Sequence, residues 1–247
     1  MIDDSRLELH VRSKSYRAAS GAVLDVLCKF SLSLARGEVA AIVGPSGCGK
    51  TTALRIIAGL DRDFDGTVAR PSPGRLGVVF QEPRLLPWRT VAQNVRLAAP
   101  EAGDDLVGQL FATLGLTEHA DHFPGELSLG LARRVSLARA FAVEPDVLLL
   151  DEPFVSLDGA LARDLRRALA ALVAARPVTT LLVTHDIEEA VELADRLLVL
   201  SPRPAQELCE LKLDPPRAAR TPADLARMCE MVRGRITDGA ANNPLSP

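Results

Sequence analysis

The sequence has no excess of basic charge and no long apolar run. Its 247 residues include 29 basic and 32 acidic side chains, and the resulting net charge of −3 gives no overall field that would favour a nucleic-acid partner. No uncharged apolar stretch approaches the roughly 18 residues of a membrane span. The start, Met1 to Arg6, lacks the apolar region of a secretory signal. We therefore expect a cytoplasmic protein without a nucleic-acid partner.

Metal ligands and disulfide partners are also scarce. The four cysteines show no Cys-x-x-Cys spacing, which favours buried or incidental thiols; they are Cys28, Cys48, Cys209 and Cys229. His119 and His122 are spaced to face one side of a helical turn and could bind a metal, but no third ligand is evident nearby. Solvated surface histidines are the favoured interpretation.

What the sequence does contain is typical of a soluble α/β protein, with 47% hydrophobic and 25% charged residues. Four short apolar runs predict strands buried on both faces, as in a parallel sheet covered by helices. These runs are Val39 to Val43, Val147 to Leu150, Thr179 to Val183 and Leu197 to Leu200. Earlier apolar residues alternate with polar ones, which predicts an N-terminal antiparallel β-layer; they are Leu7, Leu9, Val11, Leu32 and Leu34.

The stretch between Pro87 and Glu144 has a helical pattern and predicts an inserted helical subdomain. The expected helices are Thr90 to Ala98, Asp104 to Leu114 and Ser128 to Ala142, with breaks at Gly115 and Pro124-Gly125. Near the end of the chain we expect a helix from Pro222 to about Arg235, followed by ten loose residues that include Asn242-Asn243-Pro244.

A phosphate-binding loop (P-loop) directly follows the first buried run. The segment fits Gly-x-x-x-x-Gly-Lys-[Ser/Thr]; its residues are Gly44, Pro45, Ser46, Gly47, Cys48, Gly49, Lys50, Thr51 and Thr52. The glycines allow backbone N–H groups to surround phosphate oxygens, while Lys50 can reach the terminal phosphates and Thr51 can hold Mg2+. A helix from Lys50 to about Ala58 would favour the bound anion. The Cys48 thiol, beside that helix N-terminus, is hypothesised to have a lowered pKa.

A carboxylate pair follows the second buried run. Asp151 fits the role of orienting Mg2+. Glu152 would lie one step further out, where it could polarise a water that attacks the γ-phosphate. A solvated surface acid is the alternative for Glu152, and the Asp-Glu-Pro sequence after an apolar strand argues against it.

The order of motifs resembles that of the nucleotide-binding subunits of ATP-binding cassette (ABC) transporters. After the P-loop come Gln81, Leu127-Ser128-Leu129-Gly130, Asp151-Glu152, Ser156-Leu157-Asp158 and Thr184-His185-Asp186. The resemblance runs from about Leu7 to about Arg235. It implies one ABC ATPase domain over residues 1–247, with a RecA-like core and β-layer at 1–86 and 145–200, a helical subdomain at 87–144 and a tail at 201–247.

The same resemblance implies roles for single residues. Tyr16 would stack on adenine, with an ordinary core or surface tyrosine as the alternative. Gln81 would contact Mg2+ and the attacking water, and His185 would bind the γ-phosphate and orient Glu152. Asp158 would lie at the seam of an ATPase dimer, unless it serves only as a helix N-cap.

The segment Leu127 to Gly130 departs from the family pattern, Leu-Ser-Gly-Gly. In such transporters this segment presents its serine and N–H groups to the nucleotide of the opposing subunit, a role implied here for Ser128 and Gly130. Leu129 keeps the N–H but adds bulk and restricts φ where glycine would be free. We expect slower hydrolysis, and a nonhydrolytic ATP-binding module is the alternative.

The segment Gln81 to Trp88 is similar to Phe-Gln-Glu-Pro-Arg-Leu-Leu-Pro-Trp of the nitrate, sulfonate, taurine and pyrimidine-precursor importer group. An importer subunit would work as a pair of identical copies at the cytoplasmic face of the membrane. Glu82 to Trp88 would contact the transmembrane permease subunits, and an extracytoplasmic solute-binding protein would act indirectly. A loop buried against the helical subdomain is one alternative, and a soluble ABC ATPase of translation or DNA repair is another.

Overall fold

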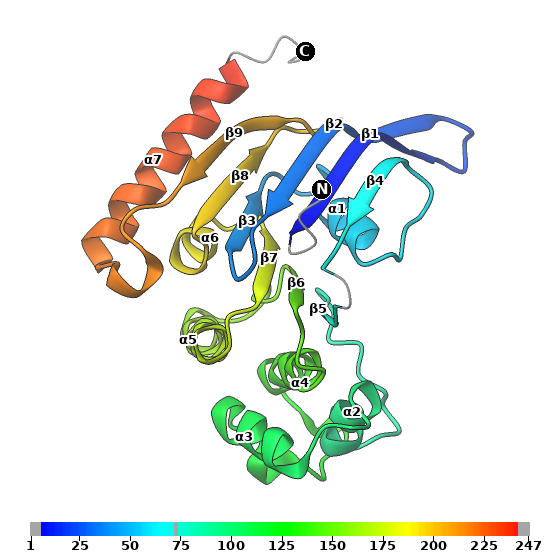
Figure 1. Cartoon of the computed structure of the whole chain (residues 1–247), viewed down its shortest axis with the longest axis vertical. Helices are drawn as coiled ribbons and strands as arrows, with labels where there is room; N and C mark the ends of the chain where they lie inside the picture. The colour runs from blue at the N-terminus through cyan, green and yellow to red at the C-terminus, as the bar shows by residue number, and fades with distance from the viewer. Residues whose placement is uncertain (1–5, 72–73, 242–247) are drawn as a thin grey trace. The chain divides into compact units, whose positions relative to one another are not determined.

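The computed structural model describes residues 6–71 and 74–241, which form two compact parts (Figure 1). The first part contains residues 6–71 and 179–241, and the second contains residues 74–178. Residues 1–5 at the start of the chain and Asn242-Asn243-Pro244 near its end, for which we have expectations from the sequence, lie outside the described residues. The subdomain boundaries expected from the sequence, at 86/87 and 144/145, stay a prediction.

The first part is built on a mostly parallel sheet with the strand order β7-β3-β8-β9. Strands β3, β7 and β8 are parallel, and β9 runs antiparallel to β8. Their bounds are β3 Val39–Val43, β7 Thr179–Thr184, β8 Arg196–Leu200 and β9 Glu207–Lys212. Every residue of β3 and β7 is buried, which confirms that these apolar runs are strands covered on both faces.

An antiparallel layer with the order β2-β1-β4 belongs to the same part. Its strands are β1 Leu7–Arg17, β2 Val23–Leu34 and β4 Asp65–Ala69. Leu7 pairs with Leu34 and Leu9 with Leu32, and all four side chains are buried, whereas His10 is exposed. The predicted alternation and the N-terminal β-layer are confirmed.

The helices of the first part pack on its mostly parallel sheet. They are α1 Lys50–Ile57, α6 Ile187–Leu193, α7 Pro222–Ala241 and the short η3 Arg217–Ala219. Helix α7 packs along α6 and β9 (Figure 1), and it buries Met228, Cys229 and Val232. The expected end of this helix at about Arg235 was wrong: α7 continues to Ala241, so residues 238–241 are helical.

The second part joins a parallel strand pair to a group of helices. The strands are β5 Leu76–Val79 and β6 Val147–Asp151. The helices are α2 Val91–Ala98, α3 Asp104–Leu114, α4 Leu129–Ala142 and α5 Gly159–Ala175, with short turns η1 Thr117–His119 and η2 Pro124–Glu126. Helix α4 is central, because it contacts α2, α3, α5 and β5.

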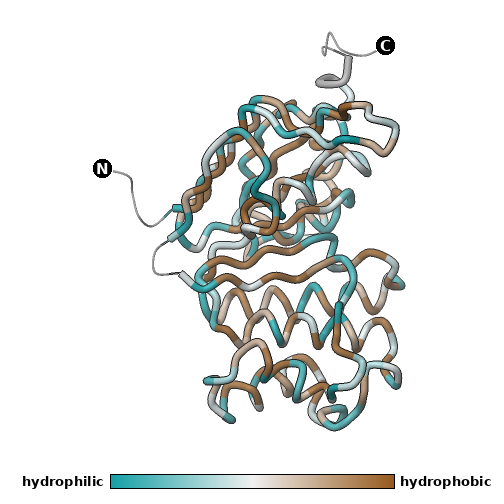
Figure 2. The backbone as a smooth tube through the Cα atoms, turned by 90° about the vertical axis from the view of Figure 1, so that its right-hand side faces the viewer, coloured by the Kyte–Doolittle hydropathy of each residue, from teal (hydrophilic) through white to brown (hydrophobic). Residues whose placement is uncertain are grey.

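Local signals explain where these helices begin and end. Thr90 and Gln93 form a capping box at the start of α2, and Gly115, at φ 64°, ends α3 in the left-handed conformation. The traces of the helices alternate between apolar and polar residues (Figure 2), as expected when one face packs and the other meets water. The helices predicted for this region are confirmed.

Candidate functional site

The P-loop connects β3 to α1. Gly47 and Gly49 have φ values of 76° and 130°, which residues with a side chain rarely adopt. A Cβ on Gly49 would also lie 2.9 Å from Leu27 Cδ2. The loop therefore requires glycine at this turn for conformational and steric reasons.

The start of α1 fits a phosphate group. Gly49 at the N-cap supplies no side-chain hydrogen bond, and the first turn contains no acidic residue, so nothing on this helix competes with an external anion. Lys50 is 4% exposed, and its Nζ donates to the Gly44 carbonyl at 2.8 Å and the Pro45 carbonyl at 3.1 Å. The ammonium is thus held beside the loop whose N–H groups would surround phosphate oxygens.

The hypothesis that the Cys48 thiol has a lowered pKa was wrong. Cys48 is 1% exposed, and burial raises the pKa of its thiol although the Lys50 charge acts in the opposite direction. Desolvation therefore outweighs the cationic neighbourhood and sets the direction of the pKa shift.

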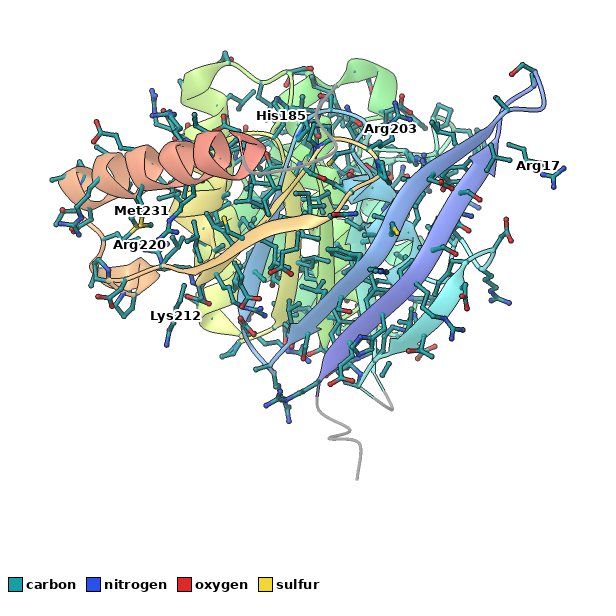
Figure 3. The ribbon with its side chains drawn as sticks, turned by 90° about the horizontal axis from the view of Figure 1, so that it is seen from above. Arg17, His185, Arg203, Lys212, Arg220 and Met231 are labelled. Carbon is teal, nitrogen blue, oxygen red and sulfur yellow. The ribbon has the colours of Figure 1, made fainter. Side chains whose placement is uncertain are left out.

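His185 lies at the same sheet edge as the P-loop. In the parallel pair of β3 and β7, Val43 is aligned with Thr184, so the residues that follow these two strands emerge side by side. The Thr184 hydroxyl donates to the Glu189 carboxylate at 2.7 Å, and Asp186 caps α6. These bonds fix the turn that carries His185, which is exposed (Figure 3).

Arg203 is a third contribution to this edge that sequence reasoning missed. It follows β8, and its Nη2 lies 3.7 Å from the position that a Cβ on Gly47 would occupy. Arg203 is exposed, and its side chain is labelled in Figure 3. Its position in Ser201-Pro202-Arg203-Pro204, right after an apolar strand, was the available signal.

Tyr16 lies in a small polar cluster on β1. Its hydroxyl donates to Asp61 Oδ2 at 2.7 Å, and Lys14 Nζ lies 4.4 Å from the ring centroid. Burial raises the pKa of the phenol, and a hydrogen bond with Thr52 of the P-loop opposes that shift. Tyr16 is 37% exposed. With Lys14 on one face of the ring, the opposite face is the one that a flat ligand could use.

In the second part, Asp151 and Glu152 occupy the end of β6. Asp151 is 4% exposed, and Glu152 is half-buried. Glu152 has a φ of 45° and Ser156 a φ of 63°, so two non-glycine residues of this turn are left-handed. Such residues cost about 1–3 kcal/mol each and persist only where neighbouring groups hold them.

Helix α4 begins at the segment that departs from the family pattern. Ser128 is its N-cap, and its Oγ accepts the Leu131 N–H at 3.3 Å. Leu129 occupies the first helical position and is 44% exposed. Its backbone is helical, a conformation that leucine adopts readily, so the exposed side chain is the main difference from glycine here. The expected slowing of hydrolysis stays a prediction.

Gly130 and Asp158 both act in the packing of α5. A Cβ on Gly130 would lie 2.3 Å from Leu161 Cδ2, so glycine permits a close approach. The Asp158 carboxylate accepts the N–H groups of Ala160 and Leu161 at 3.1 and 2.9 Å. Asp158 is therefore the N-cap of α5, and its role at a dimer seam stays a prediction.

The segment Glu82 to Trp88 is tied to α4 and α2. Arg139 donates to the carbonyls of Pro83 and Arg84, both at 2.9 Å. Trp88 is 68% exposed, whereas Leu85 and Leu86 are half-buried. The backbone of this segment is therefore held by α4, while the Trp88 side chain is exposed to solvent. Gln81, just before this segment, is exposed.

The histidine pair offers no recognised metal site. The rings of His119 and His122 lie 5.1 Å apart and are half-buried. Among the described residues, no group of three or more histidine, cysteine, aspartate or glutamate side chains could hold a metal ion. Within the same residues, no helix is long and apolar enough to span a bilayer.

The sequence matches known proteins over most of its length. Residues 27–155 match the family model described as ABC transporter. The chain is 41% identical to the aliphatic sulfonates import ATP-binding protein SsuB 2 of Burkholderia cenocepacia strain HI2424, over 96% of this chain and 91% of that protein. It is 47% identical to SsuB 1, of the same description, from Pseudomonas savastanoi pv. phaseolicola, over 92% and 94%.

Solved structures agree with this match. The dimeric structure of MJ0796, a bacterial ABC transporter cassette, is similar at a TM-score of 0.75 and 28% identity, over 85% of this chain and 99% of that one. A post-hydrolysis state of the same cassette, bound to ADP and Pi, has a TM-score of 0.73. The predicted family and its α/β P-loop fold are confirmed: the chain belongs to the ABC transporter family and is an ATPase of that family.

Proposed function

We propose that this chain is the ATP-hydrolysing subunit of an importer for aliphatic sulfonates or a related small solute such as nitrate or taurine. The observation that supports this proposal most directly is the P-loop. There the Lys50 ammonium and the start of α1, which has no side-chain cap, both offer positive charge to a bound phosphate. Relatives that are 41% and 47% identical over most of their length are import ATP-binding proteins for aliphatic sulfonates.

The nucleotide would be held chiefly by the first part of the chain. Tyr16 offers adenine the ring face opposite Lys14, and its link to Thr52 supports placing the base beside the P-loop. Residues Gly44 to Thr52 hold the phosphates through N–H groups, and Lys50 neutralises the terminal charge. Ser128 and Gly130 would serve the nucleotide of a second copy.

Magnesium would be held by Thr51, Gln81 and Asp151, as the family resemblance implies, and each of these side chains has an oxygen of the kind that this ion prefers. When bound, the ion neutralises charge on the β- and γ-phosphates. Glu152 would accept a proton from the attacking water, and the family resemblance implies that His185 would contact the γ-phosphate and orient Glu152. The turn fixed by Thr184 and Asp186 supports that role for His185.

The proposed assembly places two copies of this chain on two permease subunits at the cytoplasmic face of a membrane. The dimeric form of a similar cassette supports the pairing. Trp88, at 68% exposure, supports contact of the segment Glu82 to Trp88 with the permease. A solute-binding protein outside the membrane would act through the permease.

The hydrolytic role is tested by Mg2+-dependent phosphate release from wild type, Glu152→Gln and Glu101→Gln. Glu101 is an exposed glutamate of the same part and is the matched control. We expect Glu152→Gln to lower kcat by roughly 100-fold or more while ATP binding persists, because a general base contributes about that much. Equal turnover in wild type and Glu152→Gln would overturn the assignment of Glu152.

The cargo is tested by uptake of labelled ethanesulfonate, taurine and nitrate by cells with and without a functional copy of this chain. Loss of ethanesulfonate uptake in cells that carry only Lys50→Ala would support sulfonate import. Unchanged uptake of all three solutes would contradict the proposed substrate group, while leaving the ATPase activity intact.

A further inference from the structure

Arg133 reaches from α4 to the backbone that carries Glu152. Its side chain is buried, with the residue only 5% exposed. Nη1 donates to the carbonyls of Glu152 at 3.4 Å and Pro153 at 3.0 Å, and Nη2 donates to the Val155 carbonyl at 2.7 Å. One guanidinium therefore binds three carbonyls of a single turn.

This turn has an unusual backbone conformation at both ends. Glu152 and Ser156, at its two ends, have φ values of 45° and 63°. Two backbone hydrogen bonds inside it are long: Val155 N–H donates to the Glu152 carbonyl at 3.3 Å, and Leu157 N–H donates to the Phe154 carbonyl at 3.3 Å. A left-handed Glu152 aims its carboxylate differently from a residue that continues β6, so the backbone conformation sets where the carboxylate lies.

An arginine suits this position better than other polar residues. Its planar fork carries five N–H donors, so that one side chain can bind carbonyls that point from different directions. A glutamine is shorter and carries its donors on one nitrogen, so it would not span the carbonyls that Nη1 and Nη2 of Arg133 reach from two separate atoms. A lysine keeps the charge but offers its donors from a single atom.

We propose that Arg133 is a positioning residue that holds Glu152 in its left-handed conformation and thereby sets the place of the carboxylate for the attack on ATP. This inference rests on the proposed role of Glu152. Because Arg133 lies on α4, whose N-cap is Ser128, it also connects the helix proposed to serve a second copy's nucleotide with the Glu152 turn of its own chain.

The neighbouring residue Arg134 provides a matched control. It lies on the same helix, and its Nη1 donates to the Leu114 carbonyl at 2.9 Å. Arg134→Gln is thus the same chemical change as Arg133→Gln, made at the next residue of the helix. The Arg134 guanidinium also binds a backbone carbonyl. The substitution should leave the Glu152 turn in place.

The test compares wild type, Arg133→Gln, Arg133→Lys, Arg134→Gln and Glu152→Gln in steady-state phosphate release. Arg133→Gln is expected to lower kcat roughly 10- to 100-fold with an unchanged KM for ATP, because a small misplacement of a reacting group costs about that much. Arg133→Lys should lose less, and Arg134→Gln should match wild type.

A second readout separates positioning from folding. If Arg133→Gln only slows hydrolysis, the variant should accumulate as an ATP-bound pair in the presence of Mg2+ and ATP, as Glu152→Gln should, in size-exclusion chromatography. A structural defect would instead lower ATP binding and pair formation, and that result would overturn the positioning role. The two variants combined should be no slower than Glu152→Gln alone.

The outcomes distinguish the two proposals. Turnover by wild type that is lost in Glu152→Gln but unchanged in Arg133→Gln would overturn the role of Arg133 alone. Equal losses in Arg133→Gln and Arg134→Gln would also overturn it, since they would reflect α4 in general. Absence of phosphate release from wild type would remove the proposed function and the role of Arg133 with it.

Discussion

The Asn94 side chain binds both the N–H and the carbonyl group of Leu86. Its Oδ1 accepts the Leu86 N–H at 2.8 Å, and its Nδ2 donates to the Leu86 carbonyl at 3.2 Å. The same Nδ2 donates to the carbonyls of Arg89 and Thr90, both at 3.0 Å. Asn94 is 1% exposed, so this single amide anchors the proposed permease-contact segment to α2.

The first prediction concerns that amide. Asn94→Asp keeps the shape but removes every Nδ2 donor and places a carboxylate among carbonyl oxygens. We expect the free energy of unfolding to fall by about 3 kcal/mol, because a buried charge would be left with unfavourable partners. Urea unfolding followed by circular dichroism at neutral pH measures this change.

Gln93→Glu is the control for that substitution. The Gln93 side chain acts as an acceptor for the Thr90 N–H at 3.2 Å, and it lies in the first turn of α2. A carboxylate keeps that bond and is favoured near a helix N-terminus. Stability should be unchanged or slightly higher, and a loss equal to that of Asn94→Asp would contradict the explanation.

The second prediction concerns the close approach of α4 and α5. Gly130→Ala places a Cβ against Leu161, which must move, and we expect a cost of about 1–3 kcal/mol in the free energy of unfolding. Leu161→Ala removes the obstructing atoms. The double variant should therefore lose less stability than the two single losses added together. Additive losses in a double-mutant cycle would argue against a steric conflict.

The third prediction concerns the pH dependence contributed by Cys48. Burial raises the pKa of this thiol in the folded state, so its contribution to stability is full below the unfolded pKa and is lost as pH rises through the folded pKa. Wild type should lose more thermal stability than Cys48→Ser between about pH 8 and pH 10, a window that includes the usual thiol pKa of about 8.5 and extends above it. Cys28→Ser, which keeps Cys48, should behave like wild type.

Much of the fold follows from local sequence. The apolar runs of β3 and β7 predict buried strands, and Thr90 and Ser128 mark helix starts through hydrogen bonds to residues three positions later. The P-loop was equally readable, because its spacing dictates both the turn and the helix that follows. These features need no knowledge of distant contacts.

The features that sequence reasoning missed depend on long-range packing. The Cys48 thiol is governed by its burial, which its sequence neighbours do not reveal. Arg203 comes beside Gly47 because β8 aligns with β3, and Arg133 reaches Val155 across the packing of α4.

The fourth prediction separates the ring of Tyr16 from its hydroxyl. Tyr16→Ala should raise the KM for ATP roughly 5- to 10-fold, since an aromatic contact is worth about 1 kcal/mol. Tyr16→Phe loses the bond to Asp61 but keeps the ring, and its KM should stay close to that of wild type. If Tyr16→Phe is impaired as much as Tyr16→Ala, the hydrogen bond rather than stacking matters.

The fifth prediction concerns Leu129, whose side chain is 44% exposed at the first turn of α4. Because its backbone is already helical, the obstacle to the opposing nucleotide is bulk, and Leu129→Ala should raise kcat on the order of tenfold by freeing the nearby N–H donors. Leu129→Gly should give a similar kcat but unfold more readily, since glycine costs a helix about 1 kcal/mol relative to alanine. Phosphate release and urea unfolding of both variants measure these effects. A kcat that rises only in Leu129→Gly would assign the effect to backbone freedom. An unchanged kcat in both variants would show that Leu129 does not limit hydrolysis.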